Sequence, residues 1–254
     1  MDRNLLVIIR YDGRAFHGWQ VQKNAVTAMG TFQTALEGIL HEHVDIKGCS
    51  RTDAGVHAAM YGVSFHTGCG IPCAGLVRAL NAALPPTMAA RDCREVPQDF
   101  HARYSARGKK YTYRILNTPL RDPFSDGLTY LVPTRLDTDL MQREAQDLVG
   151  THDFAAFRNA GTDVSDTVRT IFSCDVSRHG DIIELSVAGD GFLYNMVRII
   201  AGTLIDIAHG TLPCGCIPGI LASGERSRAG FTAPACGLML TEVFYDFPTG
   251  GGGT

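Results

Sequence analysis

One short stretch, GCSRTDAGVHA at residues 48–58, places three side chains that could do chemistry among small and hydroxyl-bearing neighbours: Arg51, Asp53 and His57. An Asp followed by Ala-Gly is typical of a tight turn, because a short carboxylate bonds its own backbone and Gly accepts a positive φ. An ionised carboxylate held on such a turn is also a competent nucleophile toward an electrophilic carbon. The stretch by itself leaves both interpretations of Asp53 open, a turn residue and a chemical group.

A positive charge in an apolar segment elsewhere bears on that choice. Residues 191–208, GFLYNMVRIIAGTLIDIA, are apolar on almost every side of a helix, which predicts a long buried one. Arg198 lies in its middle, and the i, i+3, i+4 spacing places Tyr194 and Asn195 on its face. A buried guanidinium is costly without a carboxylate, unless its partner is purely structural or its end reaches the surface. We therefore expect an acid beside Arg198, and Asp53 is the leading candidate.

The absence of a second carboxylate in the Asp53 motif limits the reactions it could support. Glycosidases use a second carboxylate because their leaving group is an alcohol that must be protonated. A leaving group that is already stable as an anion, such as uracil, needs no such acid. A glycosidase or phosphotransferase acting on a small substrate would want that acid or Mg²⁺ ligands near Asp53, and the motif offers neither.

A basic segment points to a polyanionic partner. Residues 101–121, HARYSARGKKYTYRILNTPLR, contain six Lys or Arg and no acid, whereas the whole chain has a net charge of −3. Such a segment is typical of a docking face for nucleic acid, although a solvated strand edge has the same appearance. Tyr111, beside Lys109 and Lys110, is predicted to stack on an unpaired base, whereas Tyr113 is predicted to lie in the core.

Composition excludes several classes of protein. The 254 residues are 45% hydrophobic and 19% charged, as in soluble globular proteins. The N-terminal apolar run ends after five residues at Arg10, too short for a signal peptide, and no later segment could span a membrane, so we expect a cytoplasmic protein. The eight cysteines and nine histidines match no metal-binding spacing, and Cys214-Gly-Cys216 is a ligand pair without a second; we expect no metal.

The periodicity predicts the same order of elements, β-α-β-β-α-β, in each half of the chain. In the first half strands are expected at 4–10, 45–50, 58–67 and 88–96, with helices at 27–44 and 72–84. In the second half strands are expected at 109–117, 167–180, 181–189 and 237–247, with helices at 136–150 and 191–208 and a short one near 217–223. This order predicts an α+β fold of two ferredoxin-like (RRM-like) halves, 1–104 and 105–247, with a flexible tail at 248–254. If joined into one mainly antiparallel sheet, with the helices on one face, they would leave the other face as an RNA-binding cleft.

Seven motifs, in order between about residues 4 and 246, together resemble the tRNA pseudouridine synthase A family. They are YDGRAFHGWQVQKN, GCSRTDAGVHA, NAALPP, DFHARYSARGKKYTYRI, HDFAAF, GFLYNMVRIIAGTL and PACGLML. One departure is TAMGTFQTAL, which replaces a commoner Thr-Val-Gln form and concerns helix packing. The resemblance implies an enzyme that isomerises uridine to pseudouridine at positions 38, 39 and 40 of the tRNA anticodon stem-loop. It also implies a homodimer that needs no cofactor or metal.

The resemblance also implies roles for individual residues. Asp53 corresponds to the nucleophile, Arg51 and Arg198 to its supporting cations, and Tyr111 to the base-stacking tyrosine. The remaining RNA contacts are expected in the N-terminal loop and the basic segment, at Arg14, Gln20, Lys23, His101, Arg103, Lys109 and Lys110. The alternative function is a tandem RRM-like RNA-binding protein without catalysis, which would have no use for a buried Arg-Asp pair.

Overall fold

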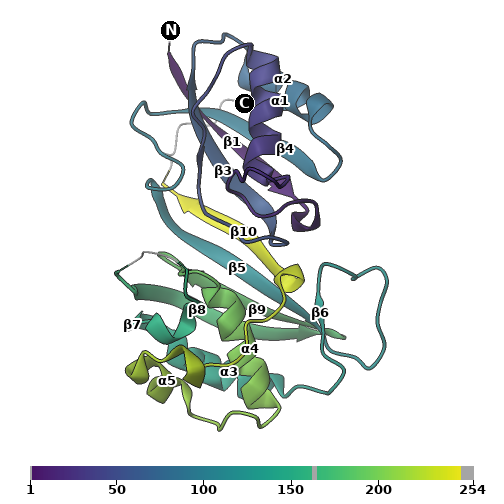
Figure 1. The fold of residues 1–254 in the computed structure, drawn as a ribbon, viewed down its shortest axis with the longest axis vertical. Coiled ribbons are helices and arrows are strands. Elements are labelled where there is room, and N and C mark those ends of the chain that lie inside the picture. The colour runs from purple at the N-terminus through teal and green to yellow at the C-terminus, as the bar shows by residue number, and fades with distance from the viewer. Residues whose placement is uncertain (1, 162–164, 247–254) are drawn as a thin grey trace, which may run out of the picture. The chain divides into compact units, whose positions relative to one another are not determined.

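The structure, a computed structural model, describes residues 2–161 and 165–246. The chain forms two compact units (Figure 1). Of the described residues, the N-terminal unit comprises 2–54, Ala58–Lys109 and 242–246, and the C-terminal unit comprises Gly55–His57, 110–161 and 165–241. The predicted division at 104/105 is simpler than this one, because three strands contribute residues to both units. The predicted tail, 248–254, lies outside the described residues.

The fold is mixed α+β, with a mostly antiparallel sheet. In the part of the chain that the structure describes, ten strands take part, in the order β4-β1-β3-β10-β5-β9-β8-β7, with β2 on β3 and β6 on β5. The β5–β6 pair is parallel. Strand β5 (Ala106–Leu116) and strand β10 (Leu238–Tyr245) each contribute several residues to both units, and β3 (His57–Thr67) contributes His57 to the C-terminal unit.

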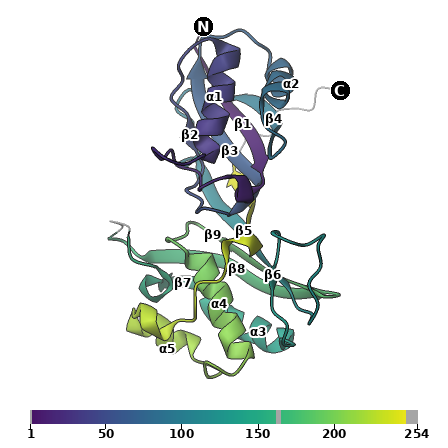
Figure 2. The same ribbon diagram turned by 45° about the vertical axis from the view of Figure 1, so that its right-hand side comes forward.

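The elements of the N-terminal unit follow the predicted order. They are β1 (Arg3–Tyr11), α1 (Ala28–Leu40), β2 (Lys47–Gly48), β3 (His57–Thr67), α2 (Cys73–Ala83) and β4 (Met88–Val96). Helix α1 begins where the Thr27 side chain accepts a hydrogen bond from Gly30 N, and α2 begins after Pro72. The two helices pack side by side (Figure 2), and their apolar stripes, with Phe32, Leu36, Leu76 and Leu80, are fully buried.

The C-terminal unit adds elements that periodicity did not predict. Besides β5 and β10 it contains β6 (Tyr130–Leu131), α3 (Thr138–Ala145), β7 (Gly150–Asp153), β8 (Val168–His179), β9 (Ile182–Gly189), α4 (Met196–Ala208) and α5 (Ile217–Ser223). The short strands β6 and β7 were not predicted. The predicted β8–β9 hairpin is confirmed, and Gly180 in its turn has φ +61°. Helices α3 and α4 pack together, and α3 lies against β8.

The helix predicted at 191–208 begins later, at Met196. Asn195 has a left-handed backbone, with φ +62°, so the chain cannot be helical before it. The predicted burial is confirmed, since all but three of its thirteen residues are buried. In the described residues, no helix combines the length and the apolar character needed to cross a lipid bilayer.

Candidate active site

The turn that carries Asp53 is held in place by its neighbour Thr52. The Thr52 side chain is 8% exposed and its hydroxyl forms a 2.8 Å hydrogen bond with the Tyr11 hydroxyl. The Thr52 carbonyl accepts a 3.0 Å hydrogen bond from Trp19 N. Ala54 and Gly55 then form a turn, with Gly55 at φ +80°, as the motif predicts. Turn and chemistry are therefore compatible interpretations, because the turn presents Asp53 on a fixed support.

Aromatic packing makes that support rigid. The Trp19 and Tyr61 rings lie 4.2 Å apart between centroids, and the Tyr61 hydroxyl donates to the Ser50 carbonyl. Gly48 lies against the same two rings, where a Cβ would come within 2.6 Å of the Trp19 indole. Bulky rings packed without space for a methyl group fix the backbone on both sides of residues 49–52. Asp53 itself is half-buried and Arg51 is exposed.

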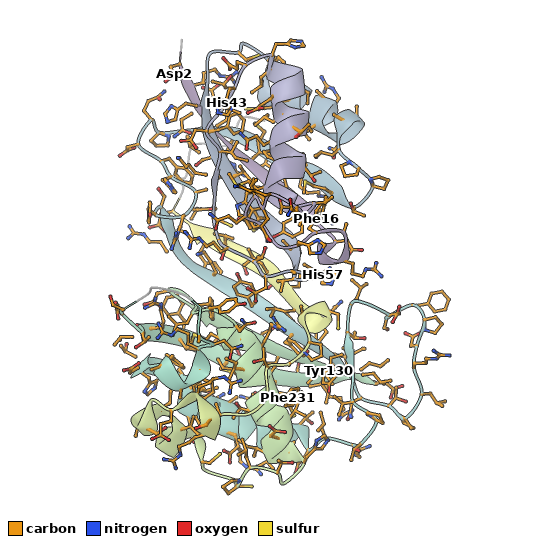
Figure 3. All side chains as sticks on the ribbon, viewed as in Figure 1. Asp2, Phe16, His43, His57, Tyr130 and Phe231 are labelled. Carbon is orange, nitrogen blue, oxygen red and sulfur yellow. The ribbon has the colours of Figure 1, made fainter. Side chains whose placement is uncertain are left out.

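The next residues of the same motif belong to the C-terminal unit. Gly55 packs against Ala235, whose Cβ is 3.3 Å from where a Gly55 Cβ would lie. His57, which Figure 3 labels, is 2% exposed, and its Nε2 lies 2.9 Å from the Gly127 carbonyl oxygen. A buried imidazole bonded to a backbone carbonyl has a structural role, so the histidine of the motif serves packing.

The two tyrosines on β5 are both buried, so neither is an exposed ring on which a base could simply stack. Tyr113 is fully buried, as predicted, and its hydroxyl donates to the Pro234 carbonyl at 2.8 Å. Tyr111 is 6% exposed, and its ring meets Phe192 edge to face with centroids 5.1 Å apart. Because Phe192 covers part of the ring, Tyr111 is an oriented aromatic group, and its stacking on a base stays a prediction.

Arg198 is held by polar groups from two directions. Its Nε donates to the Ala233 carbonyl at 2.7 Å, and its Nη1 donates to Asn195 Oδ1 at 2.6 Å. Ala233 N in turn donates to the Arg198 carbonyl at 3.1 Å. The predicted association of Asn195 with Arg198 is therefore confirmed, but from the residue before the helix instead of from a shared helical face. Asp53 and Arg198 belong to different units, so their pairing stays a prediction.

The segment 230–233, which contains the carbonyl that accepts the Arg198 hydrogen bond, is held against α4 by a close backbone contact and a hydrogen bond. A Cβ at Gly202 would come 1.9 Å from the Phe231 carbonyl oxygen, so only glycine allows the segment to lie there. Gly230 N donates to the Thr203 hydroxyl at 2.9 Å. The Phe231 ring also meets Tyr130 edge to face, with centroids 6.2 Å apart (Figure 3). The carbonyl that binds Arg198 is therefore part of a rigid support.

Arg198 also acts electrostatically on its surroundings. Burial raises the pKa of the Tyr113 hydroxyl, and the positive charge of Arg198 opposes that shift. Burial likewise raises the pKa of the Cys236 thiol against the same charge. Because burial raises both pKa values, the hydroxyl and the thiol stay neutral at physiological pH and do not form ion pairs with Arg198.

The described residues offer no metal site. Across 2–161 and 165–246, no group of three His, Cys, Asp or Glu side chains could hold an ion. The groups described above hold a carboxylate in the N-terminal unit, and a guanidinium and an aromatic ring in the C-terminal unit.

Comparison with known proteins identifies the family. The model of the family described as tRNA pseudouridine synthase matches residues 7–105 and 145–246. The chain is 47% identical to tRNA pseudouridine synthase A of Acetivibrio thermocellus and 45% identical to that of Ruminiclostridium cellulolyticum, with 96% of this chain and 100% of each relative covered. The chain belongs to the tRNA pseudouridine synthase family. It is an isomerase that acts on tRNA.

A further relative and one solved structure complete the comparison. The tRNA pseudouridine synthase A 2 of Clostridium tetani is 44% identical, over 97% of this chain and all of that protein. A crystal structure of a Cbf5-Nop10-Gar1 complex matches at 12% identity with a TM-score of 0.40, covering 95% of this chain and 50% of that one, and supports no conclusion here.

In this tRNA pseudouridine synthase the predicted RNA contacts of the N-terminal loop are exposed. Gln20 and Lys23 reach solvent without a hydrogen bond that would occupy them within the described residues. Arg14 is exposed but forms an ion pair with Asp12, at 2.6 Å between Nη2 and Oδ2. The positive charge of Arg14 is therefore partly neutralised, and RNA would have to compete with Asp12 for it.

The basic segment lies near a positive charge, Lys47, that is distant from it in the sequence. Burial lowers the pKa of His101, and the charges of Lys47 and Arg103 act in the same direction. Burial also lowers the pKa of Lys109, again with Arg103 contributing. Lys47 lies on β2, far from the segment in sequence, and was not predicted. Lys47 and Arg103 thus act on His101 within the N-terminal unit, where Asp45, the ion-pair partner of Lys47, opposes them.

An exposed aromatic residue in the same region was also missed. Tyr104 is 76% exposed, the Arg103 guanidinium lies 5.6 Å from its ring centroid, and the His101 ring lies 4.4 Å from it. Its position between Arg103 and Ser105 in the basic segment was the available signal, since basic residues with interleaved aromatics are typical of RNA-binding surfaces. Lys110, the last predicted contact, is half-buried on β5.

Proposed function

We propose that this tRNA pseudouridine synthase modifies uridines at positions 38, 39 and 40 of the anticodon stem-loop, with Asp53 as the reacting carboxylate. In this proposal Arg51 and Arg198 supply positive charge and Tyr111 holds the target base. The observation that carries it is the fixation of Asp53: its neighbour Thr52 is bonded through both side chain and backbone, at 2.8 Å and 3.0 Å.

The reaction requires a base to leave the stack before any bond changes. Flipping the target uridine costs a few kcal/mol, which contacts to the flipped base and the phosphates offset. Asp53 then either attacks the ribose or the ring carbon, or removes a ribose proton. In each route the N-glycosidic bond breaks, the uracil turns and its C5 bonds to the ribose carbon that N1 has left. C5 then loses its proton, and N1 gains one in its place. No atom is gained or lost overall, so no co-reactant is needed.

The preorganised groups account for the absence of a second carboxylate. Uracil leaves as a stabilised anion, and a guanidinium fixed by two hydrogen bonds, as Arg198 is, offers a positive charge without reorganisation. Neutral Tyr113 and Cys236 beside it do not compete for that charge.

We further infer that each unit is a ferredoxin-like half. In the N-terminal unit the four strands, numbered by their order in the chain, are arranged 4-1-3-2, as β4-β1-β3-β2. In the C-terminal unit β10, β5, β9 and β8 follow the same arrangement. This order is expected for a β-α-β-β-α-β unit with right-handed crossovers.

The partner and location belong to the same proposal. We propose a homodimer that works in the cytoplasm and takes the anticodon arm of tRNA as substrate. Light scattering should give twice the 27.4 kDa mass of one chain. A monomer at the concentrations where the enzyme is active would refute the dimer and leave the reaction untouched.

Asp53→Asn tests the central assignment. The variant should fold and bind tRNA but form no pseudouridine, as measured by carbodiimide modification and primer extension. The matched control is Asp2→Asn, which changes an exposed carboxylate of the same unit outside the family motifs and should keep full activity. Product formed by Asp53→Asn at the wild-type rate would refute the role of Asp53.

Three tRNA substrates test the positions separately. Each carries a single uridine at position 38, 39 or 40 and cytidine at the other two. Product with all three supports the proposed range, and product only at a uridine outside the anticodon arm would refute it.

A further inference from the structure

Two cysteines of the N-terminal unit lie close together without being joined. Cys73 is the first residue of α2, and Cys93 lies on β4. Both are free thiols, and the Cys73 side chain lies near enough to Cys93 to contribute to the raised pKa of the Cys93 thiol. Neither residue belongs to the motifs that identify the family, so the reaction on tRNA gives no reason for the pair.

The register between α2 and β4 explains why these thiols meet. Asn81 fixes it, because its Nδ2 donates to the Ala90 carbonyl at 2.8 Å and its Oδ1 accepts from Ala90 N at 2.9 Å. From Asn81 back to Cys73 the helix rises about 12 Å, at 1.5 Å per residue. From Ala90 on to Cys93 the strand advances about 10 Å, at 3.3 Å per residue. The two elements run in opposite directions, so both paths end at the same level.

A β-bulge turns Cys93 toward the helix. Ile8 pairs with Asp92 and Ile9 with Ala90, which leaves one extra residue on β4 between the two pairs. The extra residue shifts the alternation, so Cys93 and Ala90 are both buried although they are three apart. Without the bulge, Cys93 would point away from α2.

The surroundings give the two sulfurs different properties. Cys73 is half-buried and reachable from solvent, and Arg3 Nη2 lies 3.9 Å from its Sγ. Arg3 is itself anchored, by donating from Nη1 to the Cys69 and Ile71 carbonyls and from Nη2 to Glu95. Because Cys73 is the more exposed of the two cysteines, an oxidant in solution reaches its sulfur first. Cys93 is 8% exposed, and burial raises the pKa of its thiol.

We propose that Cys73 and Cys93 form a reversible redox pair, in which a hydroperoxide oxidises Cys73 and Cys93 completes a disulfide between α2 and β4. The Cys73 thiolate attacks one peroxide oxygen, the O–O bond breaks, and Cys73 becomes a sulfenic acid while the peroxide is reduced to water or an alcohol. The Cys93 sulfur then displaces the sulfenic oxygen, which leaves as water with the thiol proton. A dithiol reductant reverses the oxidation by exchange.

The experiment uses the full-length reduced protein treated with hydrogen peroxide. Peptide mapping without reduction should recover residues 73 and 93 in one cross-linked pair that has lost two hydrogens, and dithiothreitol should abolish it. Two fewer of the eight thiols should then react with maleimide. The oxidised protein should unfold at a higher temperature than the reduced one, because the bridge restricts the unfolded chain.

Two variants make the order of events testable. Cys93→Ser should stop at a sulfenic acid on Cys73 that dimedone labels, and peroxide should not raise its unfolding temperature. Cys69→Ser is the matched control, since Cys69 is a nearby partly exposed cysteine outside the pair, and it should still form the bridge. Three outcomes would each overturn the proposal. They are a bridge from Cys73 to Cys69, bridges only between copies of the chain, and no bridge although the wild-type protein remains folded and Cys73 is consumed. If Cys93→Ser does not fold, Cys73→Ser replaces it, and there the absence of any thermal shift is expected.

Discussion

The turn at Asp53 depends on a glycine that lies outside its own motif. Gly18 has φ +84°, and a Cβ at this position would come 2.6 Å from the Thr52 carbonyl oxygen and 3.3 Å from Ala54 N. The first distance is well below 3.4 Å, where ordinary van der Waals contact begins. We therefore predict that Gly18→Ala disturbs the placement of Asp53 while every group proposed to react remains present.

The size of the effect follows from two contributions. A left-handed backbone costs about 1–2 kcal/mol for alanine. Relief of the close approach must come from Thr52, which cannot move alone, because Tyr11 holds its hydroxyl and Trp19 holds its carbonyl. The shift then passes to Asp53, and a misplacement of about 1 Å costs on the order of 10²-fold in rate. We expect a loss of about 2–3 kcal/mol in the free energy of unfolding and a roughly 100-fold slower single turnover.

Urea denaturation measures the first effect, and single-turnover pseudouridine formation at low temperature measures the second on folded protein. Gly38→Ala is the matched control: Gly38 is exposed on α1 with nothing within 4 Å of its Cβ. That substitution should stabilise the protein by up to about 1 kcal/mol and leave turnover unchanged. A folded Gly18→Ala enzyme with wild-type turnover would refute the argument that Thr52 transmits strain to Asp53.

Three further predictions concern burial and charge. Tyr113→Phe leaves the Pro234 carbonyl without its donor and should cost about 1 kcal/mol of unfolding free energy in urea denaturation; no loss would contradict the hydrogen bond. Burial lowers the pKa of His101 in the folded protein. As the pH falls below 6.5, the His101 imidazole therefore binds a proton in the unfolded chain before it does so in the folded protein. The wild type should therefore lose stability relative to His101→Gln below that pH and not above it, and parallel profiles would show that the imidazole is not buried. Lys109→Gln should lower the slope of log K for tRNA binding against log salt by about one phosphate contact. Arg91→Gln, at an exposed position of β4, should leave the slope unchanged. Equal slopes for the two variants would show that RNA does not contact Lys109.

Local signals were sufficient for most elements of the fold. The α1 and α2 stripes repeat at helical spacing, Pro72 and Thr27 mark where they begin, and Gly180 marks the β8–β9 turn. Each of these signals acts over a few residues, so the sequence contains all of it. Strands β6 and β7 were missed because two to four residues carry no readable period and depend on their partners. The start of α4 was missed because Asn195 is pinned by Arg198, a contact that overrides the apolar pattern before it.

The sequence by itself determined the family and predicted which residues carry the chemistry, because motif types and spacing are properties of the chain. Asp53, Arg51 and Arg198 could be named from it, and so could the turn at Ala54-Gly55. Only the tertiary structure decided what holds them. Tyr11, Gly18 and Trp19 fix the turn from more than thirty residues away, and Ala233 fixes Arg198 from thirty-five residues away. Such supports are set by packing between distant segments, which no local pattern records.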